Sequence, residues 1–481
     1  MGQGIDILLI IPHQPGTADI LSGASGITPP LGAGYIASYL EKNNFSVKIL
    51  DNSIERLNET EFRAYIKKVD PLYAGFSVCT SSYNNAVYMA NIVKEINRDI
   101  KVIMGGVHAS ALPGEVLKNE AVDIVVKGEG EETTLNLLRA LNKNEDLSKI
   151  NGLVFRGADK LIETPERELI VNIDNLPFPA YHLLNMNKYS LPAQRRLTDK
   201  PCGAVITSRG CVYKCFFCSH NSIFKGKIRF RSVQNVIAEI KHLVADYKIG
   251  ELLIWDDSFL LDRGRALEFC RLIKEEKIDI IWSCSSRVNQ ISDDLAKELY
   301  TAGCRLILFG AESGSQLILD SINKNTTLLN ISDAISACRK NRILSFCSFI
   351  LGTPQENEET IEETLRFVKK INPDFAIFCI FSPLPGSVFF DRFISTGQLD
   401  ISKLNWDNYI NLLSNAPPVI SLCQISEKRL VLLQKKCFRS FYFRPKYILQ
   451  RLKNIRSWGN FYQSWRGLLA LARLQLNKFR F

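Results

Sequence analysis

The 481-residue chain lacks the long apolar run of a membrane-spanning helix, because no stretch of about 18 uninterrupted apolar residues occurs in it. Its N-terminus, MGQGIDILLIIPHQPG, also lacks the basic start and the long apolar region of a signal peptide. We find no sequence repeat of fixed period. With 46% hydrophobic and 23% charged residues, the composition is that of a globular protein. We therefore expect a cytoplasmic protein of about two to four domains.

Disulfide bonds are not indicated either. The 13 cysteines are an odd number, and most of them stand singly inside apolar runs, as Cys270, Cys284 and Cys347 do. This pattern is typical of buried thiols in a reducing compartment. Only one group of three cysteines departs from it.

Positive charge is concentrated at the C-terminal end. Residues 427–481 contain 14 Lys or Arg and one Glu, a net charge of +13, which leaves −3 for the rest of the chain out of a total of +10. Aromatic residues alternate with these cations, and the segment after Pro445 predicts a helix with Tyr447, Ile448, Leu452 and Ile455 on one side. Such a tail suits packing on the protein's own core, contact with anionic lipid, or, least favoured, nucleic acid.

Strand and helix patterns alternate over residues 1–145. Short apolar runs stand at 5–11, 47–50, 72–78, 101–106 and 123–128, with helix-like stretches between them. The alternation predicts a Rossmann-like, flavodoxin-like α/β domain with a parallel sheet. Ligands of such sheets bind at the carboxyl ends of the strands. The candidate ligand-binding residues at those ends are Ser77, Gly105, Gly106, His108, Gly128 and Glu129.

A second α/β region follows a proline-rich segment. Four prolines interrupt residues 146–200, which we interpret as a linker. From 201 the alternation resumes, with apolar runs at 203–208, 252–257, 280–286, 305–313, 344–352 and 375–381. Six β/α units predict a partial (β/α)6 barrel of TIM type over 201–395, and a second doubly wound sheet is the alternative. Residues 396–481 would form a basic helical extension.

The strongest chemical signal is a CxxxCxxC motif made by Cys211, Cys215 and Cys218. It follows the first strand of the barrel, so it is expected on a loop at the carboxyl end of that strand. Three thiolates at this spacing can bind three irons of a [4Fe–4S] cluster and leave the fourth iron open. A zinc site is the alternative, with Cys202 or His220 as the fourth ligand.

The motif resembles the signature of the radical S-adenosylmethionine (SAM) superfamily, in which an aromatic residue, here Phe217, precedes the last cysteine. The resemblance implies that the open iron binds the amino and carboxylate groups of SAM. It also implies that one electron from the cluster cleaves SAM to a 5′-deoxyadenosyl radical.

Other segments agree with this resemblance. Asp256 or Asp257 in WDDSF (255–259) would contact the SAM amino group. Glu312 in FGAESGS (309–315) would reach into the barrel, and Gly352 in FILGTPQE (349–356) would lie beside the adenine. Arg287, after the third strand, would bind a carboxylate or ribose. The alternatives are a turn or helix cap for the aspartates, a buried ion pair for Glu312, and a surface salt bridge for Arg287.

The N-terminal half resembles the cobalamin-binding domain that precedes the barrel in one large radical SAM class. The segments that carry this resemblance are PPLGAGYIASYL (29–40), GGVHAS (105–110) and GEGEET (128–133). None of the five histidines has an aspartate two residues before it, so the D-x-H-x-x-G motif that ligates cobalt in many cobalamin domains is absent. This suggests cobalamin without that axial ligand, and leaves open a domain that has lost cobalamin. His108 is the histidine nearest the site, although a hydrogen-bonded loop histidine is the simpler interpretation.

These resemblances favour a cobalamin-dependent radical SAM enzyme that transfers a methyl group to an unactivated carbon. Its substrate would be a small or lipid-like molecule, and its electron donor a ferredoxin or flavodoxin. Peripheral contact with the inner face of a membrane would come from the basic tail.

Three other hypotheses are weighed against methyl transfer. The first is radical cyclisation or rearrangement of a tetrapyrrole or lipid without methyl transfer. The second, from another class, is a zinc-containing nucleic-acid-binding module. The third, methylthiolation of RNA, needs a second group of three cysteines near the N-terminus, and only Cys79 precedes Cys202.

Overall fold

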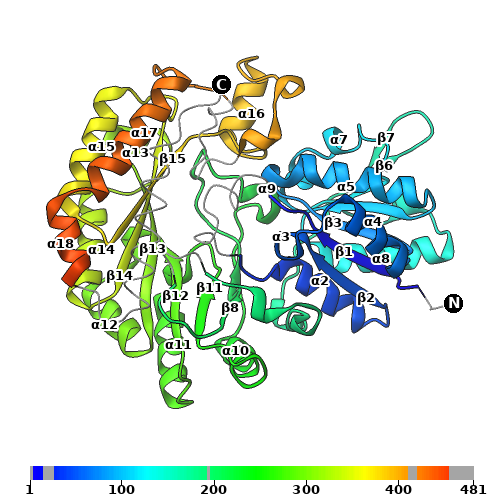
Figure 1. Ribbon diagram of the computed structural model, residues 1–481, viewed down its shortest axis with the longest axis horizontal. Coiled ribbons are helices and arrows are strands. Elements are labelled where there is room, and N and C mark those ends of the chain that lie inside the picture. The colour runs from blue at the N-terminus through cyan, green and yellow to red at the C-terminus, as the bar shows by residue number, and fades with distance from the viewer. Residues whose placement is uncertain (1–3, 15–26, 192–195, 410–419, 454–481) are drawn as a thin grey trace.

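The structure is a computed structural model that describes residues 4–14, 27–191, 196–409 and 420–453. Two lobes lie side by side, an N-terminal lobe around one sheet and a larger lobe around a second sheet (Figure 1). The predicted α/β class is confirmed.

The N-terminal lobe is built on a seven-stranded sheet of order β2-β1-β3-β4-β5-β6-β7. Its first five strands pair in parallel. Each of them is an apolar run that a helix connects to the next strand, which is typical of parallel sheets covered on both faces. The strands are β1 (Ile7–Ile11), β2 (Val47–Asp51), β3 (Tyr73–Ser77), β4 (Lys101–Gly105), β5 (Ile124–Val126), β6 (Leu153–Arg156) and β7 (Leu161–Glu163). The order 2-1-3-4-5 is that of flavodoxin-like sheets, which bind ligands where the order reverses, between β1 and β3.

Helices cover both faces of this sheet. One face packs on α2 (Leu31–Glu41) and α8 (Gly130–Lys143), the other on α4 (Glu59–Val69) and α5 (Tyr83–Ile96). The alternate residues of β1 divide accordingly, with Ile7 and Leu9 on the first face and Leu8 and Ile10 on the second. Four shorter helices complete the lobe: α3 (Asn52–Glu55), α6 (Val107–Ala111), α7 (Pro113–Val116) and α9 (Asn221–Phe224), the last contributed by the barrel region.

Part of the segment expected to be a linker belongs to this sheet. Strand β6 pairs antiparallel with β5, and β7 pairs antiparallel with β6. They are only four and three residues long, too short for a clear alternating pattern, and the prolines of the segment begin after them.

The second lobe is an open barrel of six parallel strands in the order β15-β14-β13-β12-β11-β8. The strands are β8 (Cys202–Val205), β11 (Glu251–Ile254), β12 (Ile281–Ser286), β13 (Cys304–Glu312), β14 (Leu344–Leu351) and β15 (Phe375–Ile380). Helices between them are α10 (Val233–Tyr247), α11 (Arg263–Glu275), α12 (Asp293–Thr301), α13 (Gln316–Ser321), α14 (Leu328–Lys340) and α15 (Glu358–Ile371). The predicted partial barrel is confirmed, and its strand ends are where a site is expected.

After β15 the chain crosses back to the N-terminal lobe. Helix α16 (Val388–Ser395) and the 3-10 turn η9 (Trp406–Tyr409) share one hydrophobic core with β3 and α5, through Phe389, Phe393 and Trp406. In Figure 1, α16 lies at the top of the view, between the barrel and the N-terminal lobe. The segment therefore ties the barrel to the other sheet.

The described part of the basic tail packs on the barrel. Helix α17 (Glu427–Tyr442) buries Leu430, Leu433 and Phe441 in the barrel core, and α18 (Pro445–Lys453) follows it. Ile455, predicted on the apolar side of the tail helix, lies outside the described residues. Within the described ranges, no helix is long and apolar enough to cross a bilayer.

We expect Gly106 to be essential for the strand-end turn of the N-terminal sheet. Its φ of +98° is in the region that favours glycine, and a Cβ there would lie 2.6 Å from the carbonyl oxygen of Val78. Gly106→Ala should lower the free energy of unfolding by about 2–4 kcal/mol. Gly32→Ala is the control, because nothing lies within 4 Å of its Cβ position. Urea denaturation of both variants checks this, and equal stabilities would contradict it.

Candidate active site

The three cysteines lie on a loop framed by a small hairpin. Strands β9 (Ser208–Arg209) and β10 (Arg229–Phe230) pair antiparallel, and the cysteine loop runs between them. Cys215 is buried, whereas Cys211 and Cys218 are half-buried. Burial is the main cause that raises the pKa of Cys211 and that raises the pKa of Cys218 to about 11, with smaller contributions from neighbouring cysteines. In the described part of the chain no three Cys, His, Asp or Glu side chains converge as a formed metal site. Three close thiols on one loop nevertheless fit the donor set of an iron–sulfur cluster.

One proposed zinc ligand is excluded. Cys202 begins β8, so it lies at the end of the strand opposite the loop, and its Sγ donates to the Tyr189 carbonyl at 3.5 Å. His220 does lie beside the loop. Its Nδ1 is 3.1 Å from Asp257 Oδ1, and its Nε2 is buried without a hydrogen-bond partner.

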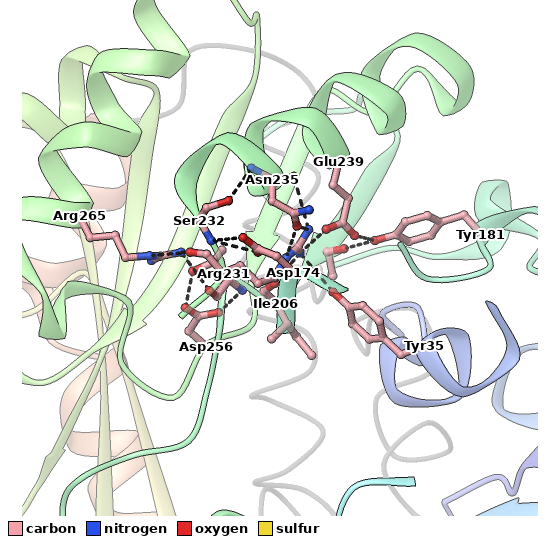
Figure 2. Close-up of polar contacts among 12 residues, drawn as sticks. Tyr35, Asp174, Tyr181, Ile206, Arg231, Ser232, Asn235, Glu239, Asp256 and Arg265 are labelled. Atoms are coloured by element: carbon pink, nitrogen blue, oxygen red, sulfur yellow. Dashed lines mark hydrogen bonds and ion pairs between the residues drawn. The ribbon is translucent and has the colours of Figure 1, made fainter. Parts of the chain in front are cut away.

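The two aspartates after β11 have different surroundings. Asp256 is buried and accepts hydrogen bonds from Thr207 N (2.6 Å), Thr207 Oγ1 (2.5 Å) and Ser208 Oγ (2.6 Å). Burial raises its pKa, and these donors oppose that shift. Asp256 therefore fixes the segment that leads into the cysteine loop (Figure 2). Asp257 is half-exposed on the loop side and is the freer of the two for a ligand.

Arg287 lies against the cysteine loop and is not on the surface. It is 6% exposed, and its guanidinium carbon is 3.8 Å from the ring centroid of Tyr213. Its Nη1 donates to Cys215 Sγ at 3.5 Å, and its Nη2 donates to the carbonyl of Lys324. The third barrel strand thus holds the buried cysteine of the motif.

Glu312 forms a buried ion pair at the end of β13. Its Oε1 is 2.7 Å from Lys324 Nζ, and Ser348 Oγ is 3.5 Å from its Oε2. The backbone of Glu312 has a φ of +63°, and the pairing of β13 with β14 shifts register here. Gly310 allows the pair, because a Cβ there would lie 2.2 Å from Glu312 Oε1. Lys324 also lies 5.8 Å from the ring of Phe217, the half-buried aromatic of the motif. Sequence reasoning missed Lys324, since nothing local marks its long-range partner.

Gly352 lies in a turn held by a carboxylate that the sequence did not single out. Its backbone N donates to Glu356 Oε2 at 2.5 Å, and Thr353 N donates to the same oxygen at 3.1 Å. Burial raises the pKa of Glu356 to about 7. A Cβ on Gly352 would lie 2.9 Å from Leu430 of α17, so this side of the turn packs closely against that helix.

The predicted cobalamin residues lie along one edge of the N-terminal sheet, with one exception. Ser77 and Gly105 end neighbouring paired strands, and Gly106 follows. Gly128 has a φ of +75° with nothing within 4 Å of its Cβ position, so the space beside its Cα is open, while its backbone N donates to Ser110 Oγ at 3.0 Å. This glycine-rich, half-buried edge fits cobalamin, because a ligand can approach a backbone closely where side chains are absent.

The exception is Glu129, whose carboxylate turns toward the barrel and not toward the glycine edge. It contacts Arg209 at 2.8 Å and Arg229 at 2.7 Å. Burial opposes its ionisation, but the two guanidinium groups outweigh it and lower its pKa. The prediction that Glu129 contacts a cofactor is therefore not supported by its contacts, because its oxygens are used by the barrel.

His108 is fully buried under the crossing segment. Its ring stacks on Tyr83 at 4.4 Å and meets Trp406 edge-on at 4.8 Å. Nδ1 lies 3.3 Å from Thr80 Oγ1, while Nε2 is buried without a hydrogen-bond partner. Burial lowers the pKa of His108 to about 4, so the ring is neutral at pH 7. Trp406 could not be foreseen, because it comes from the far end of the chain.

Comparisons with known proteins agree with this geometry. A family model for the radical SAM superfamily matches residues 205–368, and one for the B12 binding domain matches 18–138. The uncharacterized methyltransferase PH0819 of Pyrococcus horikoshii is 36% identical over 92% of this chain and 94% of its own. The anaerobic magnesium-protoporphyrin IX monomethyl ester cyclase of Rubrivivax gelatinosus is 30% identical over 83% and 72%. The fold matches the radical SAM methyltransferase TsrM of Kitasatospora setae, solved with cobalamin and a [4Fe–4S] cluster, with a TM-score of 0.68, 18% identity and coverage of 98% and 88%.

Fold and site thus define a radical SAM enzyme with a cobalamin-binding domain. The chain belongs to the family of cobalamin-dependent radical SAM methyltransferases and their relatives. Its cofactors are a [4Fe–4S] cluster, SAM and cobalamin.

We expect His108 to make stability depend on pH. Its pKa is about 4 in the folded protein against an ordinary 6.5. Its stabilising contribution is therefore complete above pH 6.5 and is lost as pH falls toward 4. His108→Phe should remove about 2–3 kcal/mol of this loss. Urea unfolding at pH 7 and pH 4.5 measures it, with His182→Gln, an exposed histidine, as the control. An unchanged pH dependence in His108→Phe would refute the assignment.

Proposed function

We propose that the enzyme transfers a methyl group to an unactivated carbon atom of a small molecule. The observation that carries the proposal is the approach of the two cofactor regions. Helix α9, just after the cysteine loop, packs on α6, which carries His108, and a Cβ on Gly386 would touch both Ser222 and Ala111. Two cofactors bound at these edges would share one reaction space.

On this proposal the barrel residues bind the first two cofactors. Cys211, Cys215 and Cys218 hold the cluster, and Arg287 orients Cys215. Asp257 accepts the SAM amino group, while Asp256 holds the preceding segment in place. Glu312 and Lys324 form a charged pair at the barrel mouth, and the Gly352 turn borders the adenine. Phe217 and the neighbouring aromatics exclude water.

The N-terminal residues hold the third cofactor. The backbone around Gly105, Gly106 and Gly128 admits the corrin and its tail, and Ser77 adds a hydroxyl at the same edge. His108 is neutral and lies behind this edge. When bound, the cluster supplies the electron that cleaves SAM, and cobalamin supplies the methyl group. A ferredoxin or flavodoxin would reduce the cluster.

Anaerobic turnover distinguishes methyl transfer from the second candidate, radical cyclisation, which the similarity to the Rubrivivax cyclase favours. Methyl transfer predicts 5′-deoxyadenosine and S-adenosylhomocysteine in about equal amounts, since one SAM gives the radical and another gives the methyl group. Cyclisation predicts 5′-deoxyadenosine without matching S-adenosylhomocysteine. Mass spectrometry of the products decides, and the variant with Cys211, Cys215 and Cys218 all changed to Ala should form no 5′-deoxyadenosine. Cleavage that survives this change would refute the cluster assignment.

We also propose peripheral membrane contact through the end of the described tail. Ile448 and Leu449 of α18 are 40% and 59% exposed, close to Lys446. Apolar side chains beside cations favour anionic lipid. The double variant Ile448→Ser/Leu449→Ser should reduce flotation with phosphatidylglycerol vesicles at least about threefold. Leu329→Ser on α14 is the control, because Leu329 is a leucine on a different helix that is 67% exposed. Equal flotation of all three proteins would contradict membrane contact.

A further inference from the structure

Two arginines face each other at the base of the cysteine loop. In the hairpin of β9 and β10, Arg209 stands directly opposite Arg229. Like charges at opposed positions of a strand pair repel one another. Both guanidinium groups are also nearly buried, with side chains 9% and 11% exposed. The hairpin that frames the loop therefore needs negative charge from elsewhere.

The N-terminal lobe supplies that charge from the loop after β5. Glu129 lies between the two arginines, with Oε1 2.8 Å from Arg209 Nη1 and Oε2 2.7 Å from Arg229 Nη1. Glu131 adds a contact of 2.6 Å to Arg209 Nη2, and both carboxylates are only 4% exposed. We call these four residues the charge clamp. The two charges of each sign balance, as burial of a charge group requires.

A neighbouring network fixes the same hairpin from its other side. Arg231, just after β10, donates to the Tyr35 hydroxyl at 3.1 Å and pairs with Glu239, which accepts from Tyr181 at 2.6 Å (Figure 2). The ring of Tyr35 lies 4.9 Å below Arg209. Tyr35 of α2 thus contacts both Arg209 of β9 and Arg231 after β10, which adds a second link between the hairpin and the N-terminal lobe.

The charge clamp connects the two predicted cofactor regions, because its residues are close in sequence to the Gly128 turn and to the cysteine loop. Glu129 directly follows Gly128, the glycine with free space beside its Cα at the predicted cobalamin edge. Arg209 stands two residues before Cys211. A shift of the cysteine loop would move Arg209 and, through Glu129, the Gly128 turn.

We propose that Glu129 is a positioning residue that couples cobalamin binding to occupation of the cysteine loop. This rests on the proposed function for the identity of the two cofactors. Loading the loop with its cluster holds Arg209 and Arg229 in place, and these hold the Gly128 turn in its cobalamin-binding form. By linkage, bound cobalamin favours the loaded loop to the same degree.

The test is titration of hydroxocobalamin into the full-length protein with and without the cluster, the latter with all three cysteines changed to Ala. The wild-type affinity should be at least about fivefold higher with the cluster. In Glu129→Gln this ratio should fall to within about twofold, because the two arginines lose their shared anion. Glu132→Gln is the matched control, since Glu132 lies in the same helix turn and pairs only loosely with Arg167 at 3.4 Å.

Glu129→Gln leaves Arg229 without a carboxylate partner, because Arg209 still pairs with Glu131. A charge-balanced variant therefore serves as the control for misfolding. Glu129→Gln/Arg229→Gln keeps the Arg209–Glu131 pair and should fold, as circular dichroism would show, yet also lose the affinity ratio. A wild-type ratio near one, or a full ratio in either Glu129 variant, overturns the proposal.

A second readout separates this proposal from the proposed function. In the metal-free full-length protein, Cys211 should react with iodoacetamide at least about threefold faster in Glu129→Gln than in Glu132→Gln, because the base of the loop opens more often. Absence of cobalamin binding in every protein would refute the proposed function, while equal alkylation rates would refute the clamp.

Discussion

The structure depends on charged side chains that are buried in one lobe and have their partners of opposite charge in the other lobe. The barrel presents Arg209 and Arg229 on one small hairpin, and the N-terminal lobe presents Glu129 and Glu131 at the start of α8. Separation of the lobes would leave either set unpaired in an apolar contact. An unpaired buried charge is among the most destabilising features of a protein interior, so the lobes hold one relative placement.

This placement explains how two sheets of different architecture serve one site. Parallel strands collect their functional residues at their carboxyl ends. In this chain, the helices and loops that follow those ends contact each other through α6 and α9. On the proposed function, each sheet would supply one wall of the reaction space.

The sequence predicted the features that local patterns carry. The parallel strands are apolar runs, and the strands of both sheets lie close to the predicted ranges. Contacts between residues that are far apart in the sequence could not be predicted from these local patterns. Within GEGEET, Glu129 looks like a ligand-binding residue, and only the fold shows that its carboxylate pairs with two arginines. The roles expected for Arg287 and Glu312 stay predictions, and their partners Cys215 and Lys324 could not be read from the sequence, because they follow from strand order. Strands β6 and β7 were missed because they are too short to show a period.

The crossing of α16 and η9 onto the N-terminal sheet has a consequence for synthesis on the ribosome. The surface around Tyr83 and His108 is completed by Trp406, which is made only after the whole barrel. The nascent first lobe therefore emerges with an uncovered apolar face, a hazard for aggregation until translation has passed the barrel and reached this segment. A chain that stalls before this segment would be a natural client of chaperones.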